Sequence, residues 1–292
     1  MKFLDAQELR ALYGQSGAAQ LRLNQPLQHR QSGDVLSSAV GDGLDYWDSR
    51  PYQTGDDPRH MDWRLSARTG EPYQKRFLAE RRPSIVVAVD RGRSMRFGTQ
   101  VRIKAAQAHR VAALLAMAAV EQGWVVDHYH FDQGIEAAPR VDDRLGLTAH
   151  LAQLVIAPTL EQPSDLAHTL HHLASRIRPG TPLYVVSDFF ALNTRAEARL
   201  AAIAAHCTVI AVRLFDPAEL TLPQVAEIEL NDGIAARAIE TLPHDRARYA
   251  KAATSRMAQI EQTLTRAGCQ VIAISTIDAA LSAVPLPHGW GQ

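Results

Sequence analysis

Cysteine is scarce in this chain, and long apolar runs and net charge are absent. Only Cys207 and Cys269 occur in 292 residues, which excludes a disulfide framework and suits a reducing compartment. The most apolar stretch, residues 111–120, is about half of the roughly 20 residues that a membrane span needs. Asp5 and Glu8 interrupt the amino end, which therefore does not resemble a signal peptide. We expect a cytoplasmic protein with no membrane span.

The formal net charge is zero, but the charges are unevenly distributed. Between Arg59 and Arg110, thirteen Lys and Arg residues stand against four Asp and Glu residues. Such a stretch favours an acidic partner surface or phosphates, unless the arginines pair with carboxylates elsewhere in the fold. No helix-turn-helix, zinc-finger or aromatic-rich sheet motif accompanies it, so we expect no specific nucleic-acid binding.

The sequence pattern divides the chain into two regions, residues 1–83 and 84–292. The first is rich in turn signals such as "GDGLD" and "YQTGDDP", which predict short strands and loops. The second alternates apolar strand-like runs with helical segments. This pattern predicts an α/β fold with a doubly wound, mostly parallel sheet, preceded by an irregular β-rich region.

Two aspartates follow strands of the predicted sheet. Asp90 ends "SIVVAVD" and Asp188 ends "TPLYVVSD". Ligands of such sheets bind outside the carboxyl ends of the strands, near the switch in strand order. With the hydroxyls of Ser94 and Ser187, the two carboxylates would suit a hard divalent cation. The alternative is that they accept hydrogen bonds from loop amides and no ion binds.

The stretch from Asp90 to Ser94 resembles the Asp-x-Ser-x-Ser motif of the metal-ion-dependent adhesion site in von Willebrand factor A domains. The resemblance implies that Ser164 takes the place of the loop threonine and that Asp188 is the later aspartate. It also implies Mg²⁺ or Mn²⁺ as the cofactor. Gly92 replaces the middle serine, so the motif is partial. The neighbouring arginines also oppose a tightly bound cation.

Residues 50–80, "RPYQTGDDPRHMDWRLSARTGEPYQKRFLAE", resemble the signature of the DUF58 family. Members combine this signature with a von Willebrand A-like domain. The resemblance implies a MoxR-type AAA+ ATPase as partner and a chaperone-like or complex-assembly role. The signature is either an architectural clasp, with Trp63 as an apolar anchor, or a partner-binding surface. The candidate partner-binding residues are Asp56, Arg59, Arg68, Arg91, Arg93 and Arg96.

The sequence also permits an enzymatic interpretation, a metal-dependent or serine hydrolase that uses Asp90 and Ser94. Gly92 and Ser94 approach the Gly-x-Ser-x-Gly nucleophile motif, but Arg96 replaces its last glycine. A hydrolase of that class would have several strands before its nucleophile, whereas this strand is the first of the sheet. We therefore expect a non-enzymatic protein.

A histidine pair offers a second candidate metal site. His128 and His130, with Asp132, could bind Zn²⁺, but no further ligand has suitable spacing. We expect these histidines to be structural.

Overall fold

The computed structural model describes residues 4–22, 46–77, 82–156, 161–223, 225, 227–231, 236–240 and 242–285. It separates into two compact units, one formed by residues 1–24 with 83–292 and the other by residues 25–82. The smaller unit ends at residue 82. The amino end belongs to the sheet unit, because Leu4 and Leu12 are fully buried in its core. Helix α1 (Ala6–Arg22) therefore packs against that unit.

A six-stranded sheet forms the centre of the larger unit, as the sequence predicted. Its strand order is β10-β7-β6-β3-β4-β5. All neighbouring pairs are parallel except the β4–β5 pair at the edge. The chain leaves β3 toward β4 and later returns to the other side of β3 as β6, so strand order switches at β3. The strands are β3 (Ser84–Asp90), β4 (Val125–Phe131), β5 (Ile135–Ala137), β6 (Leu183–Ser187), β7 (Val209–Phe215) and β10 (Gln270–Ser275).

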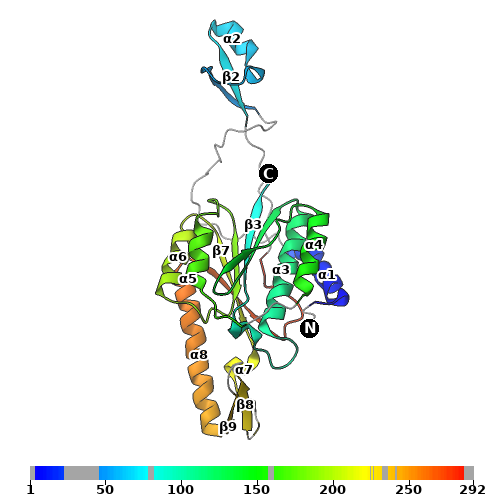
Figure 1. Cartoon of the computed structure of the whole chain (residues 1–292), viewed down its shortest axis with the longest axis vertical. Coiled ribbons are helices and arrows are strands. Elements are labelled where there is room, and N and C mark those ends of the chain that lie inside the picture. Colours follow the sequence, from blue (N-terminus) through cyan, green and yellow to red (C-terminus); the bar gives the residue numbers. More distant parts are fainter. Residues whose placement is uncertain are drawn as a thin grey trace. The chain divides into compact units, whose positions relative to one another are not determined.

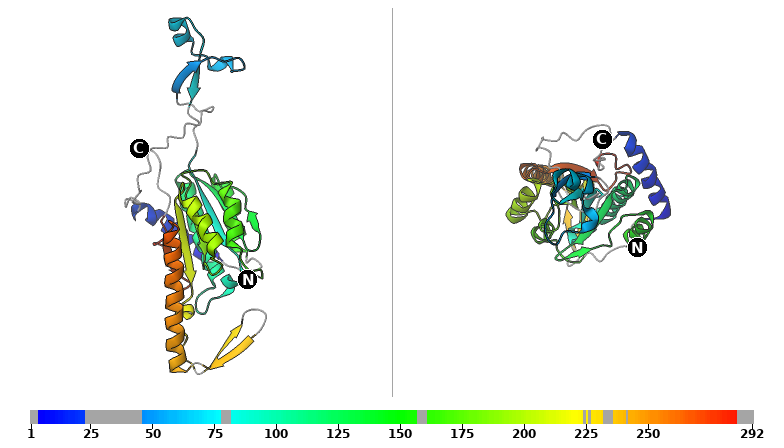
Figure 2. Two further views of the ribbon diagram at one scale, coloured as in Figure 1. Left: turned by 90° about the vertical axis from the view of Figure 1, so that its left-hand side faces the viewer. Right: turned by 90° about the horizontal axis from the view of Figure 1, so that it is seen from above.

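Helices cover both faces of this sheet (Figures 1 and 2). On one face lie α1, α3 (Lys104–Glu121) and α4 (Arg144–Val155), and on the other lie α5 (Leu166–Ala174), α6 (Thr194–Ala204) and α8 (Pro243–Arg266). Strand β3 serves both cores because side chains alternate along a strand. Its Val87 and Val89 lie in the first core, and Val86 and Ala88 in the second. This explains why its sequence is apolar without interruption.

Two helix boundaries have a clear local cause in the sequence. Gly123 follows α3 with φ 74°, a conformation that glycine adopts without strain. The N-cap of α5 is Asp165, whose side chain accepts a hydrogen bond from the His168 amide. The hydroxyl of Ser164 is thereby available to the site described below.

The smaller unit holds the signature segment. Strands β1 (Tyr46–Pro51) and β2 (Tyr73–Phe77) pair antiparallel, and the 3₁₀ helix η1 (Pro58–His60) and helix α2 (Trp63–Thr69) lie between them in the sequence. Asp57 caps η1 and Asp62 caps α2, each through a backbone amide. These two aspartates therefore stabilise helix starts within the unit. Trp63 is 67% exposed and is no buried anchor within this unit.

The remaining elements follow β7. Helix α7 (Pro217–Leu220) begins with a capping box between Asp216 and Glu219. Strands β8 (Glu227–Asn231) and β9 (Ala236–Glu240) form an antiparallel pair. No helix among the described residues is long and apolar enough to cross a membrane.

Candidate functional site

Four loops meet at the carboxyl edge of the sheet. The loop after β3 continues into the 3₁₀ helix η2 (Arg93–Arg96), and the Arg93 amide donates to the carbonyl of Gln162. The Asp165 amide donates to the carbonyl of Asp132 in the loop after β4. Strand β6 ends at Ser187, and Asp188 begins the loop that follows. These backbone bonds place the predicted site residues at the switch point of the sheet.

Asp90 lies at the centre of this edge and is 1% exposed. Its Oδ1 accepts hydrogen bonds from the Gly92 amide at 2.7 Å and from the Ser164 hydroxyl at 2.5 Å. Its Oδ2 accepts one from the Ser187 hydroxyl at 2.5 Å. Burial and the nearby Asp188 carboxylate raise the pKa of Asp90 to about 6, against the opposing effect of these hydrogen bonds. The structure thus brings Asp90 and Ser164 into direct contact.

Asp188 is also buried, but a lysine neutralises it. The Lys104 ammonium lies 2.7 Å from Asp188 Oδ2 and 2.6 Å from Glu219 Oε1. The other Asp188 oxygen accepts a hydrogen bond from the Phe190 amide. The ring centroid of Phe190 lies 4.6 Å from the ammonium, within the range of cation–π attraction.

Gly92 and Ser94 are the remaining two positions of the partial motif. A Cβ at position 92 would lie 1.8 Å from the Ser164 hydroxyl oxygen, so no other residue fits there without displacing Ser164. Ser94, on η2, is half-buried. Its side chain makes no hydrogen bond within the described part of the chain, and Ser187 rather than Ser94 donates to Asp90.

As placed, these residues do not fit a bound Mg²⁺ or Mn²⁺. Such ions take oxygen ligands, chiefly carboxylates and waters. Both oxygens of Asp90 and of Asp188 already accept hydrogen bonds from protein groups, and an ammonium contacts Asp188. The described residues include no group of three or more His, Cys, Asp or Glu side chains arranged to hold a metal.

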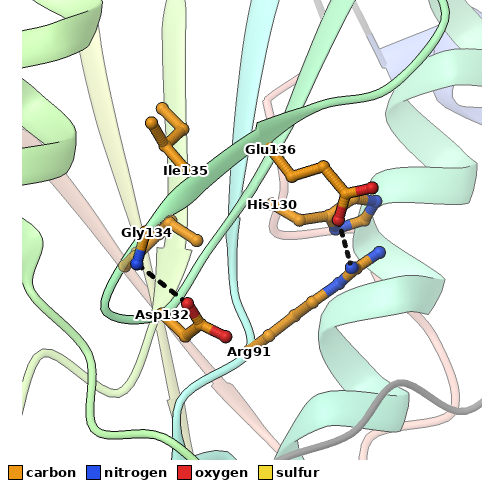
Figure 3. Close-up of a pocket in the computed structure, with 7 residues that line it drawn as sticks. Arg91, His130, Asp132, Gly134, Ile135 and Glu136 are labelled. Atoms are coloured by element: carbon orange, nitrogen blue, oxygen red, sulfur yellow. Dashed lines mark hydrogen bonds and ion pairs between the residues drawn. The ribbon is translucent and has the colours of Figure 1, made fainter.

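A pocket of about 190 Å³ adjoins this edge (Figure 3). Arg91 crosses it and lies 3.3 Å from Glu136, a side chain that is 76% exposed. His130 also lines the pocket, and the Asp132 side chain accepts a hydrogen bond from the Gly134 amide at its rim. The pocket is therefore polar and carries charges of both signs.

Arg93 and Arg96 differ from Arg91. Both lie on η2, Arg93 half-buried and Arg96 exposed. Neither guanidinium forms an ion pair or side-chain hydrogen bond with any residue that the structure describes. Two positive charges are thus unneutralised beside the Asp90 loop.

The partner-binding candidates of the smaller unit fall into two groups. Asp56 is engaged within the unit, because it pairs with Arg50 at 2.6 Å and accepts the Gln53 amide, and these bonds lower its pKa. Arg59 and Arg68 are exposed. They form no ion pair among the residues described in this unit.

Four histidines form a buried cluster under the β4–β5 edge of the sheet. His128 Nδ1 lies 2.9 Å from His150 Nε2, and the rings of His128 and His130 are 4.2 Å apart. His109 approaches His130 at 6.0 Å between ring centroids. Burial lowers the pKa of all four. The cluster is neutral near pH 7, and Asp132 is not part of it.

The sequence interpretation missed Lys104 and Glu219. A signal for Lys104 existed, because it stands at helical spacing with Ala108, Val111 and Leu115, all of which are fully buried. A lysine in such a row predicts a buried carboxylate partner, since an unpaired buried charge is costly. No comparable signal marked Glu219.

Residues 48–259 match the family model described as "Protein of unknown function DUF58". The chain belongs to the DUF58 family. Uncharacterized proteins of Mycobacterium tuberculosis and Mycobacterium bovis are each 30% identical to it over 265 residues, covering 88% of this chain and 82% of theirs. The family membership expected from the signature segment is confirmed.

Several solved structures show a more distant likeness. The VWA domain of SpRpn10 is 10% identical, with a TM-score of 0.38, and the match covers 69% of this chain and 93% of that domain. The conserved hypothetical protein BatB from Bacteroides thetaiotaomicron is 15% identical, with a TM-score of 0.37, and the match covers 63% and 98% of the two chains. A von Willebrand factor type A protein from Catenulispora acidiphila is 12% identical, with a TM-score of 0.36 over 72% and 42%.

Proposed function

We propose that this DUF58 protein is a non-enzymatic interaction protein whose carboxyl sheet edge binds an acidic surface of a partner protein. The observation that carries the proposal is the pair Arg93 and Arg96. Both project from η2 without an ion-pair partner among the described residues, next to a polar pocket that contains Arg91. Unpaired cations at an edge of this kind favour encounter with an acidic surface and set its orientation.

A MoxR-type AAA+ ATPase is the partner that we propose, in a chaperone-like or complex-assembly role in the cytoplasm. Family resemblance supports this choice. Arg59 and Arg68 of the signature segment are exposed cations that the same partner could contact.

The geometry gives little support to hydrolysis by Asp90 and Ser94. A serine nucleophile needs a base within hydrogen-bond reach, and no described side chain accepts from Ser94. His206, the first histidine after Asp188 in the sequence, lies at the opposite edge of the sheet, since its carbonyl accepts the amide of Gly180 in the loop before β6. Asp90 is buried and accepts three hydrogen bonds. We therefore keep the interaction role as the proposal.

A pull-down of the full chain with a MoxR-type AAA+ ATPase tests this function. The test variant is Arg93→Glu with Arg96→Glu, and it should weaken binding by roughly tenfold or more, because it replaces two attractions with two repulsions. The matched control is Arg176→Glu with Arg178→Glu, which reverses two exposed charges in the loop before β6, at the amino edge of the sheet. It should bind like the unaltered protein.

The result that contradicts the proposal is equally specific. If the unaltered chain does not bind the ATPase in any nucleotide state, the partner is wrong. If both double variants bind as well as the unaltered chain, the carboxyl edge is not the contact surface.

A further inference from the structure

Each carboxylate oxygen of Asp90, Asp188 and Glu219 accepts a hydrogen bond from a protein donor. Asp90 accepts from Gly92, Ser164 and Ser187, and Asp188 accepts from Phe190 and Lys104. Glu219 accepts the Asp216 amide on Oε2 and the Lys104 ammonium on Oε1. A divalent ion that used one of these oxygens would share it with a protein donor, and at Asp188 or Glu219 it would also be repelled by the Lys104 ammonium.

Two carboxylates hold Lys104 at this edge. It is the first residue of α3, and its side chain is 0% exposed. A cation at a helix N-terminus opposes the helix dipole, and burial alone favours the neutral amine. Asp188 and Glu219 outweigh both effects, because two charge-assisted hydrogen bonds of 2.7 and 2.6 Å hold the ammonium.

Position 92, where the adhesion motif has its middle serine, has no room for a side chain in this structure. A Cβ on residue 92 would lie 1.8 Å from the Ser164 oxygen and 3.0 Å from the Asp90 Oδ1 atom. The Ser164 hydroxyl therefore occupies the space that a side chain at position 92 would need. Gly92 supplies no hydroxyl ligand, and the Lys104 ammonium neutralises the carboxylates beside it. These two observations are independent, and each removes a feature that favours a bound metal ion.

We propose that the Lys104 ammonium is the resident cation of this edge and takes the place of a divalent metal ion. Asp188 and Glu219 are its ligands, and Phe190 covers it. The edge is then preformed by protein groups alone, and it keeps its shape in the absence of Mg²⁺ or Mn²⁺. This inference does not depend on which partner the protein binds.

Calorimetric titration of the full chain with MgCl₂ and with MnCl₂, after treatment with a chelator, tests the proposal. The unaltered protein should show no saturable binding at millimolar ion and no shift in Tm. Lys104→Ala removes the cation and leaves the carboxylates, so it should gain an ion-dependent rise in Tm of several degrees. Adding Asp188→Asn to Lys104→Ala should abolish that gain, because it removes a carboxylate ligand.

Two outcomes overturn the proposal. The first is stoichiometric ion binding by the unaltered protein that Asp188→Asn abolishes. The second is a folded Lys104→Ala protein that gains no ion binding. If Lys104→Ala does not fold, Lys104→Gln keeps most of the side-chain volume without the charge and is judged by the same criterion. Titration of the unaltered protein and of Asp188→Asn decides the first outcome without any change at Lys104. Loss or retention of ATPase binding has no bearing on either result.

Discussion

Acid should unfold the sheet unit through its buried histidine cluster. His109, His128, His130 and His150 are each at most 4% exposed. Burial lowers the pKa of His109 and His150 to about 4, and those of the other two also lie below the ordinary value of 6.5. Between pH 6.5 and 4 the unfolded chain therefore binds more protons than the folded one. The free energy of unfolding must fall as the pH falls through this window.

The expected loss can be worked out for a change from pH 7 to pH 5. A histidine with an unfolded pKa near 6.5 that stays neutral in the fold costs about 1.9 kcal/mol, so four cost about 7.5 kcal/mol. Asp90 acts in the opposite direction, because its folded pKa of about 6 lies above its ordinary 3.8. On acidification Asp90 binds its proton in the folded state first, which offsets about 1.3 kcal/mol of this loss. The net loss of about 6 kcal/mol is comparable with the whole stability of an ordinary domain.

Urea denaturation followed by near-ultraviolet circular dichroism at pH 7, 6, 5.5 and 5 measures this loss. The urea midpoint should fall steeply below pH 6.5. His150→Gln should reduce the slope by about a quarter, since it removes one of four coupled protons. His171→Gln, a change at an exposed position on α5, should leave the slope unchanged. A midpoint that stays constant from pH 7 to pH 5 would refute the reasoning.

Two further changes test the packing of the site and of its scaffold. Gly92→Ala should destabilise the protein by about 1–3 kcal/mol through overpacking. Adding Ser164→Gly should recover part of the loss, as a double-mutant cycle in thermal denaturation would show. Additive losses would contradict the close approach of a Cβ at position 92 to the Ser164 hydroxyl. Asn193→Ala should cost about 1 kcal/mol, because the Asn193 side chain accepts the Ala196 amide at the start of α6; an unchanged urea midpoint would show that this cap contributes nothing.

The alternation of strands and helices was enough to predict the sheet, because buried parallel strands read as apolar runs. It also placed Asp90 and Asp188 at one edge, since parallel strands end together. The packing of α1 on the sheet could not be predicted, because it depends on contacts of Leu4 and Leu12 with helix α3, far along the chain. The edge strand β5 was missed because it has only three residues.

The partners of the site carboxylates were harder to predict. The motif suggested Ser94 as the hydroxyl beside Asp90, whereas Ser187 donates to it. Spacing within a motif does not determine which rotamer reaches a neighbouring strand end. Lys104 and Asp188 are 84 positions apart, so their ion pair follows only from the three-dimensional fold.

The most direct test of the account is the affinity of the full chain for a MoxR-type AAA+ ATPase, measured in a nucleotide-free buffer with EDTA. An edge held by Lys104 and presenting Arg93 and Arg96 should bind the ATPase equally well with EDTA and with Mg²⁺, and the affinity should fall as salt rises. The Arg93→Glu, Arg96→Glu variant should lose this binding. Full binding by that variant would contradict the account.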